Sequence, residues 1–392
     1  MKYFEFYNTV RIILGENALS KLPEELLKRG GKKALLISGP VLTRIGAVDK
    51  VKKVFEGTDA EIRVVFNAVP NDSSLEVVKE IVKVYKNHDC DCIIAAGGGS
   101  VMDTAKGVKL LLINNSEDLL EYTGMEMVGK GKNLPFAAIP TTSGTGSEVT
   151  KVSVIADLEK NVKMEFITGQ ILPDFCLLDP EMTKTLPRKA TFTTAMDTLT
   201  HAIEGFTGSQ SQPLSDNFAL KAIAKFRDNM EKAVAEPENL EARMGMLESS
   251  MLAGIAFSNS MVGVVHGIGH AVGGVAHVGH DLAMAILLPA CMKFNMSHLK
   301  EKYAEVLYYI AGEKIYQETK PEDRADRCVA YIEELLEKYN KEIGVPIKFR
   351  DAGVTEDQLP LIVRKALRDG ALLANVKAVR EEDVVNILKQ SF

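Results

Sequence analysis

The chain has 392 residues, of which 46% are hydrophobic and 26% charged, and its formal net charge is −6. This length and balance are typical of a globular protein with two or three domains, and the negative charge argues against non-specific nucleic-acid binding. The N-terminus lacks the apolar core of a secretion signal, and apolar stretches such as residues 282–292 are shorter than the roughly 20 residues that span a bilayer. Five cysteines without a C-x-x-C pair are expected as buried, reduced thiols. These features predict a cytoplasmic protein with neither a membrane nor a nucleic-acid partner.

The first half of the chain alternates short β-rich runs with amphipathic stretches of helical length. This alternation predicts a parallel sheet covered by helices on both faces. The expected strands are residues 33–38, 62–66, 92–96 and 136–139, and the expected helices are residues 48–56, 74–87 and 101–113.

Strand signals vanish from about Pro187, and the rest of the chain reads as helices. Residues 179–188 hold two prolines and few apolar residues, so we place the domain boundary there. The expected helices are residues 189–207, 214–235, 240–257, 261–275, 283–295, 300–310 and 324–339. The region after residue 354 predicts a helix, a loop and a helix, with Thr355-x-x-Gln358 as a helix-start signature.

Histidines gather in two short segments of this helical half. Asp197 and His201 are spaced i, i+4 and so project from one face of a helix. His266 and His270 repeat the spacing, His280 follows, and glycines around them allow close approach of a ligand. A single histidine here could be a hydrogen-bonded core residue. The joint pattern instead predicts a site for iron, zinc, manganese or cobalt, because a shared ion offsets the cost of burying these groups unpaired.

Two glycine-rich segments follow predicted strands: GGGS at residues 97–100 and TTSGTGS at residues 141–147. Backbone N–H groups at such strand ends favour an anion, such as a phosphate. Neither segment fits G-x-G-x-x-G, since Val149 stands where the second would need its last glycine, and neither holds the G-K-[ST] of a P-loop. A structural turn explains either loop alone, but two at the carboxyl ends of strands in one sheet indicate a ligand-binding edge.

Together, GGGSVMDTAKG (residues 97–107), PTTSGTGSEVT (residues 140–150) and the aspartate–histidine pattern resemble the iron-containing, or group III, alcohol dehydrogenases. The resemblance covers most of the chain. It implies an α/β, Rossmann-like parallel-sheet domain over residues 1–185, which binds a nicotinamide dinucleotide. It also implies an all-helical, metal-binding domain over residues 186–392, with the active site in the cleft between the two. Dehydroquinate synthase shares this expected fold.

The resemblance also assigns roles to single residues. It places Fe²⁺, or Zn²⁺, on Asp197, His201, His266 and His280. His270 would lie near the nicotinamide and substrate, where we expect it to act as a catalytic proton relay. The residues that resemble cofactor contacts are Gly39, Asn71, Gly98, Gly99, Ser100, Asp103, Thr141, Thr142, Thr145 and Lys163.

The sequence departs from the family pattern at two positions. Many NAD-preferring relatives carry an aspartate after the first strand, where this chain has Ser38-Gly39-Pro40. Without that carboxylate a 2′-phosphate meets no like charge, so we expect NADP or NAD as cofactor. Relatives usually follow the last histidine with glycine, and here Asp281 follows it, as a candidate partner of the ligands.

The implied reaction transfers a hydride between a small primary alcohol or diol, or the corresponding aldehyde, and the nicotinamide, with the ion acting as a Lewis acid. One alternative is a hydroxyacid–oxoacid transhydrogenase. Another is a dehydroquinate synthase-like lyase, but residues 190–285 hold few basic side chains for an acidic substrate, and these, Arg243 among them, read as outer-helix residues. A non-enzymatic binding module is a third. The resemblance also implies a homodimer or a larger homo-oligomer.

Overall fold

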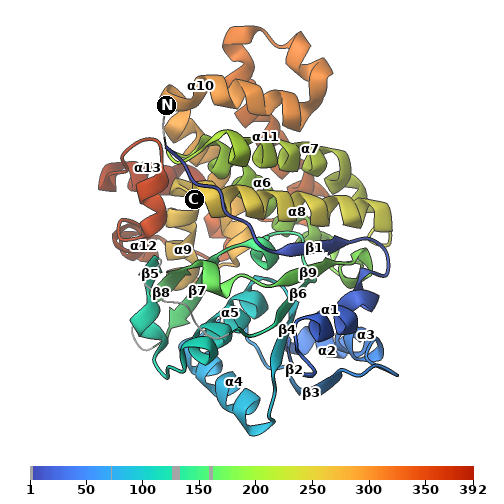
Figure 1. Cartoon of the computed structure of the whole chain (residues 1–392). Helices are drawn as coiled ribbons and strands as arrows, with labels where there is room; N and C mark the ends of the chain where they lie inside the picture. The colour runs from blue at the N-terminus through green and yellow to red at the C-terminus, as the bar shows by residue number, and fades with distance from the viewer. Residues whose placement is uncertain (1–2, 72, 126–132, 159–161) are drawn as a thin grey trace. The chain divides into compact units, whose positions relative to one another are not determined.

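The computed structural model describes residues 3–71, 73–125, 133–158 and 162–392. The chain divides into two compact units (Figure 1). The sheet unit contains Asn8–Thr142 and Gly146–Leu186, and the helical unit contains Met1–Tyr7, Ser143–Thr145 and Pro187–Phe392.

A six-stranded sheet forms the centre of the sheet unit, and within the described residues its neighbouring strands run parallel to one another, which confirms the predicted parallel sheet. The strand order is β1-β9-β6-β4-β2-β3. The strands are β1 (Arg11–Leu14), β2 (Lys33–Ile37), β3 (Glu61–Phe66), β4 (Cys92–Gly97), β6 (Phe136–Pro140) and β9 (Phe175–Leu178). Every residue of β4 and β6 is buried, as expected of central strands with a helix layer on each side.

Helices connect the strands of the sheet unit. They are α1 (Leu22–Lys28), α2 (Pro40–Arg44), α3 (Ala47–Lys53), α4 (Leu75–Asn87) and α5 (Gly99–Asn114). Leu26 of α1 and Val51 of α3 pack in one core cluster with Leu36 and Ile94 of the sheet. Successive side chains along each strand point to opposite faces of the sheet. Ser74 begins α4, and its Oγ accepts a hydrogen bond from the N–H of Val77.

A second, three-stranded sheet in the same unit has the order β5-β8-β7, and the sequence did not predict it. Its strands are β5 (Gly124–Met125), β7 (Val152–Asp157) and β8 (Val162–Ile167). β7 and β8 pair antiparallel, which places Ala156 opposite Lys163.

The helical unit contains α6 (Arg188–Thr207), α7 (Pro213–Ala235), α8 (Leu240–Ser260), α9 (Val264–Ala276), α10 (His280–Glu318), α11 (Arg324–Ile343), α12 (Leu359–Ala366) and α13 (Glu381–Ser391). The helices predicted over residues 283–295 and 300–310 both lie in α10, and the backbone leaves helical geometry between them, at Leu299, and again at Gly312. The helix start predicted at Thr355 is confirmed, because the N–H of Thr355 donates to Oε1 of Gln358 at 3.0 Å.

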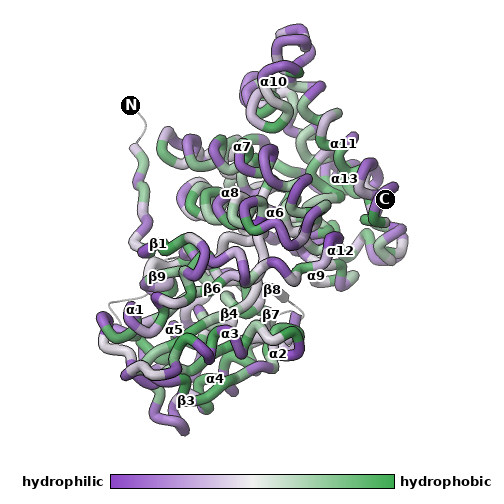
Figure 2. The backbone as a smooth tube through the Cα atoms, turned by 90° about the vertical axis from the view of Figure 1, so that its right-hand side faces the viewer, coloured by the Kyte–Doolittle hydropathy of each residue, from purple (hydrophilic) through white to green (hydrophobic). Residues whose placement is uncertain are grey.

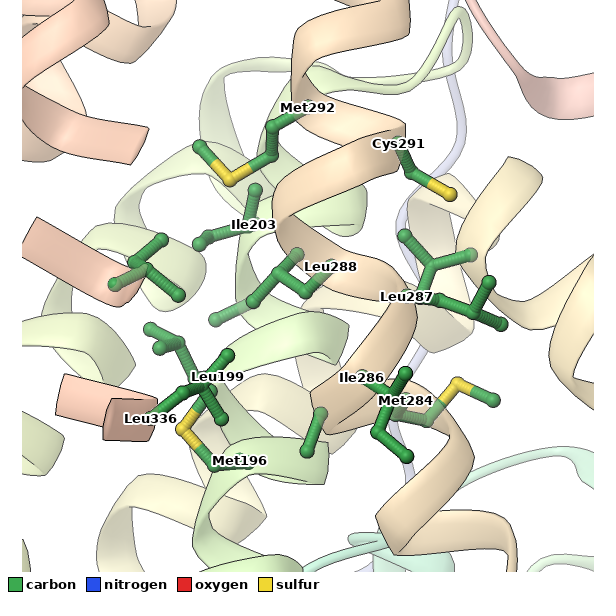
Figure 3. Close-up of a cluster of buried hydrophobic side chains, with 14 of the residues drawn as sticks. Met196, Leu199, Ile203, Met284, Ile286, Leu287, Leu288, Cys291, Met292 and Leu336 are labelled. Atoms are coloured by element: carbon green, nitrogen blue, oxygen red, sulfur yellow. The ribbon is translucent and has the colours of Figure 1, made fainter. Parts of the chain in front are cut away.

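Apolar side chains of α6 and α10 pack together in the core of the helical unit (Figure 3). Met196, Leu199 and Ile203 come from α6, and Leu287 and Leu288 come from α10; each is at most 1% exposed. Outer helices such as α7 alternate between hydrophobic and hydrophilic residues along the tube (Figure 2). The core therefore fixes the two helices that carry most of the candidate metal ligands.

One helix, α10, is long and apolar enough to pass a length-and-composition test for a membrane span, and so is the bent pair of α8 and α9. In α10, 67% of the apolar window is buried inside the protein, and interior helices of soluble proteins pass the same test.

The prediction for the cysteines is confirmed: all five are buried and unpaired.

Candidate metal centre and cofactor loops

Four side chains from three helices of the helical unit converge on one point. Asp197 and His201 project from α6, His266 from α9 and His280 from the first residue of α10. One ligand atom from each of the four lies within 4.8 Å of those of the other three. Oδ1 of Asp197 is 3.5 Å from Nδ1 of His201, 3.6 Å from Nε2 of His280 and 3.9 Å from Nε2 of His266. The structure thus brings together the four residues predicted as ligands.

The chemistry of this cluster fits a metal ion. Asp197 and His201 are almost fully buried, and Oδ1 of Asp197 and Nδ1 of His201 have no hydrogen-bond partner in the described part of the chain. Unpaired buried polar atoms are costly, and a cation bound by them would remove that cost. Three imidazoles and one carboxylate form a donor set that suits iron or zinc.

Glu204, one turn beyond His201 on α6, orients one of the candidate ligands. Its Oε2 lies 2.6 Å from Nδ1 of His266, and its Oε1 accepts a hydrogen bond from the N–H of Val265 at 2.7 Å. A carboxylate on Nδ1 fixes the imidazole with Nε2 directed toward Asp197. Glu204 was not among the site residues predicted from the sequence.

His270 lies beside the cluster but makes a different contact. Its Nδ1 is 3.0 Å from Oδ2 of Asp369, in the segment that follows α12. The imidazoles of His270 and His280 are stacked, with their ring centroids 5.4 Å apart. Asp369 was likewise not among the site residues predicted from the sequence.

Asp281, the residue that departs from the family pattern, is bonded within the helical unit. Its Oδ2 accepts a hydrogen bond from the hydroxyl of Thr193, one turn before Asp197 on α6. This bond links the start of α10 to α6, next to two candidate ligands.

Burial sets the protonation of the cluster. Desolvation by burial holds the pKa of His201 and of His266 well below the ordinary value of a histidine. The neighbouring imidazole of His266 adds to this effect at His201, and that of His270 adds to it at His266. Desolvation and the nearby charge of Asp281 raise the pKa of Asp197 well above its ordinary range. Neutral imidazole is the form that binds a metal, so His201 and His266 are ready to coordinate.

Gly267 and Gly269 of α9 pack against side chains, contrary to the expectation that glycines here make room for a ligand, whereas a Cβ added to Gly274 would meet no described atom within 4 Å. A Cβ added to Gly269 would lie 1.9 Å from Cε of Met284, and one added to Gly267 would lie 2.6 Å from Cδ2 of Leu372. Glycine at these positions therefore lets α9 approach its neighbours closely.

Arg243 also differs from its expected place on an outer face: it is 2% exposed, and its guanidinium donates to Pro237 O and Thr191 Oγ1.

In the sheet unit, the two glycine-rich loops follow neighbouring strands. Gly97 at the end of β4 lies opposite Pro140 of β6, and the N–H of Thr141 donates to Gly97 O at 3.1 Å. A Cβ on Gly98 would lie 3.2 Å from Oγ1 of Thr142, so a glycine here allows the loops to approach closely.

Four further predicted cofactor residues belong to the same region of the sheet unit. α5 begins at Gly99, so its first N–H groups lack helical partners. The hydroxyl of Ser100 donates to Asn71 O. β2 is parallel to β4, so Gly39, two residues beyond the end of β2, is at the edge where the two loops begin.

The remaining predicted cofactor residues belong to other parts of the structure or have other partners. Lys163 lies on β8 of the second sheet. The carboxylate of Asp103 accepts hydrogen bonds from Ser147 Oγ and Val154 N, each at 3.1 Å. Thr145 belongs to the helical unit, together with Ser143 and Gly144. The carbonyl oxygens of Ser143 and Gly144 accept hydrogen bonds from Thr198 Oγ1.

The sequence matches the family described as iron-containing alcohol dehydrogenase over residues 9–180. Over residues 191–392 it matches the C-terminal part of the Fe-containing alcohol dehydrogenase family. It is 32% identical over 379 residues to an NAD-dependent methanol dehydrogenase of Bacillus methanolicus, and the match covers 97% of each chain. It is 33% identical to an NADPH-dependent butanol dehydrogenase of Clostridium saccharobutylicum, covering 93% of each chain.

The structure is similar to the crystal structure of a 1,3-propanediol oxidoreductase, with a TM-score of 0.93 and 33% identity over the full length of both chains. The relatives are methanol, propanediol and other alcohol dehydrogenases. Neither the transhydrogenase nor the lyase alternative is favoured by these matches.

Proposed function

The chain belongs to the iron-containing alcohol dehydrogenase family, and we propose that it interconverts small primary alcohols or diols with their aldehydes, using a nicotinamide cofactor. The observation that carries this proposal is the convergence of one carboxylate and three imidazoles, two of whose buried atoms lack any other partner in the described chain. The named relatives act on methanol, butanol and propanediol, which supports a small substrate with one or two hydroxyl groups.

Asp197, His201, His266 and His280 would hold the ion, which we propose is Fe²⁺, with Zn²⁺ as the alternative. When bound, such an ion supplies Lewis-acid stabilisation for negative charge on the substrate oxygen. Glu204 holds His266 in the tautomer that offers Nε2. The packed core of α6 and α10 holds the ligand-bearing helices in place.

His270 is the proposed proton relay. Asp369 accepts a hydrogen bond at Nδ1 of His270, so that a proton can be gained and lost at Nε2.

We propose that the pyrophosphate of the cofactor binds at the edge formed by Gly98, Gly99, Ser100, Thr141 and Thr142. The unpaired N–H groups at the start of α5 and the close approach of the two loops support this. Asn71, Thr145 and Lys163 stay candidates for further cofactor contacts. Gly39 offers no carboxylate to repel a 2′-phosphate, so we propose that NADP is used as well as, or in preference to, NAD.

We also propose that the enzyme is a cytoplasmic homodimer or larger homo-oligomer. The five buried, unpaired cysteines support a reducing compartment. The exposed aromatic side chains of Tyr3, Phe4 and Tyr7 support self-association, as does the edge position of β1 in the six-stranded sheet.

A substrate and cofactor screen tests the function. The purified protein, loaded with Fe²⁺ or Zn²⁺ in turn, is mixed with short alcohols, diols and aldehydes in the presence of each nicotinamide cofactor. We expect a change in nicotinamide absorbance with at least one neutral alcohol–aldehyde pair. Absence of any change with both metals and both cofactors would contradict the proposal and favour a binding module.

A further inference from the structure

Lys106 lies on α5, two turns beyond the GGGS loop, and its side chain is fully buried. Its Nζ donates hydrogen bonds to Ser147 Oγ at 2.8 Å, Thr150 Oγ1 at 2.9 Å and Val152 O at 2.7 Å. An ammonium group has three donors, so all of them are used. Ser147 is the last residue of the second glycine-rich loop, and Thr150 and Val152 lie just beyond it.

Asp103, one turn earlier on α5, contacts the same segment. Its carboxylate accepts from Ser147 Oγ and from Val154 N, and its carbonyl oxygen accepts from Ser153 Oγ at 3.0 Å. Ser147 therefore accepts from Lys106 and donates to Asp103. Both oxygens of the Asp103 carboxylate have partners inside the sheet unit, which suits a supporting role better than direct contact with a cofactor.

The neighbouring face of α5 contacts a third segment. The hydroxyl of Ser100 donates to Asn71 O, and Oγ1 of Thr104 lies 2.8 Å from Oγ of Ser73. Through its polar side chains, α5 thus makes contact both with the segment that holds Asn71 and with the segment that follows the second loop.

We propose that Lys106 is a positioning residue for the nicotinamide cofactor. By holding Ser147 against α5, it fixes the end of the second loop, whose start is fixed by the hydrogen bond between Thr141 and Gly97. The N–H groups of both loops are then arranged before the pyrophosphate binds, which lowers the ordering cost of binding. The inference rests on the proposed function, because it concerns the binding of that cofactor.

The same helix provides a matched control. Lys109, one turn beyond Lys106, is also buried, at 7% exposed. Its Nζ donates to Leu172 O at 2.7 Å and lies 3.7 Å from Oδ2 of Asp174. Lys109→Met therefore removes a buried ammonium group from α5 while keeping the hydrogen bonds that join Lys106 and Asp103 to Ser147.

The test compares Lys106→Met, Ser147→Ala and Lys109→Met in the full chain, with Ser147→Thr as the conservative variant that keeps the hydroxyl. Binding of NADH and NADPH is measured by fluorescence titration, together with metal content, the melting temperature and the kcat and KM for one alcohol. We expect Lys106→Met and Ser147→Ala each to raise the Kd for the cofactor at least tenfold, or about 1.4 kcal/mol. Their metal content and their kcat at saturating cofactor should stay close to those of the wild type.

Lys109→Met should lower the melting temperature without changing the Kd, and Ser147→Thr should restore most of the affinity lost in Ser147→Ala. Wild-type affinity in either Lys106→Met or Ser147→Ala would overturn the positioning role, and if the lysine variant does not fold, the serine variant alone decides. A wild-type protein that binds neither cofactor would instead overturn the proposed function, and the inference with it.

Discussion

Oε2 of Glu204 lies 2.6 Å from Nδ1 of His266, a residue 62 positions further along the chain. The contact joins α6 to α9 and leaves Nε2 of His266 facing Asp197 and His201. Burial raises the pKa of Glu204 to about 7, while the N–H groups of Gly263 and Val265 oppose the rise. A buried carboxylate behind a histidine is the arrangement that orients metal ligands in proteins.

Replacing Glu204 with Gln should weaken metal binding about 10- to 100-fold, because the amide orients His266 less firmly and lacks the carboxylate charge. Competition with a chelator of known affinity measures the change. Asp216→Asn is the control, since it alters another carboxylate of the helical unit, one that interacts with Lys302 and Ser211, outside the ligand cluster. Equal metal affinity in Glu204→Gln and wild type would contradict the role of Glu204.

Replacing His270 with Ala should retain the metal and lower kcat roughly 10²- to 10⁴-fold, because the relay at Nε2 is lost. Asp369→Asn should cause a smaller loss, because the amide can still contact Nδ1 of His270 but orients the ring less firmly than the carboxylate does. Metal analysis together with pH–rate profiles of the two variants measures both effects. An unchanged pH profile in His270→Ala would remove this residue from the proton path.

The carboxyl of Glu148, which is 2% exposed, should make stability depend on pH. Burial raises the pKa of Glu148 from 4.5 to about 7. Between these values the unfolded chain loses the proton while the folded chain keeps it, so the free energy of unfolding falls as pH rises, and the loss is complete above about pH 7. Relative to Glu148→Gln, the wild type should therefore lose about 3 kcal/mol between pH 4.5 and pH 8.

Urea unfolding of wild type and Glu148→Gln at several pH values measures this difference. Comparing the two proteins removes the contribution of groups that they share. A difference in unfolding free energy that stays constant from pH 4.5 to pH 8 would show that Glu148 titrates normally.

Replacing Gly39 with Asp should shift cofactor preference toward NAD. A carboxylate here accepts a hydrogen bond from the ribose 2′-hydroxyl and repels a 2′-phosphate. A Cβ at this position meets only Val69 O, at 3.6 Å, so the backbone can accept the side chain without strain. We expect the ratio of kcat/KM for NADPH to that for NADH to fall at least about tenfold. Gly39→Ala is the control, and an equal shift in both variants would argue against an electrostatic cause.

Part of the fold could be predicted because its signals are local. β4 is buried throughout and most of α5 is buried, as their apolar patterns indicate, and the prediction placed each of their ends within two residues. β1 and β9 have four residues each, which is too short for a periodic pattern of apolar residues to be recognised. They form by pairing with each other. β7 and β8 likewise depend on pairing with each other.

The candidate site could also be predicted only in part, where its residues share a local pattern. The spacing of Asp197 and His201 is visible in the sequence because one helix carries both. Glu204 continues their face at i+3 from His201, and this signal could have found it. Asp369, by contrast, lies 99 positions from His270, and their contact depends on tertiary folding that no local pattern encodes.

The central claim is that Asp197, His201, His266 and His280 bind one metal ion. It is tested most directly by measuring the metal content of the wild type and of His266→Ala after exposure to Fe²⁺ or Zn²⁺ and gel filtration. We predict one ion per chain in the wild type and almost none in His266→Ala, with both proteins folded by circular dichroism. A folded wild type without a bound ion, or a His266→Ala variant with full occupancy, would contradict the account.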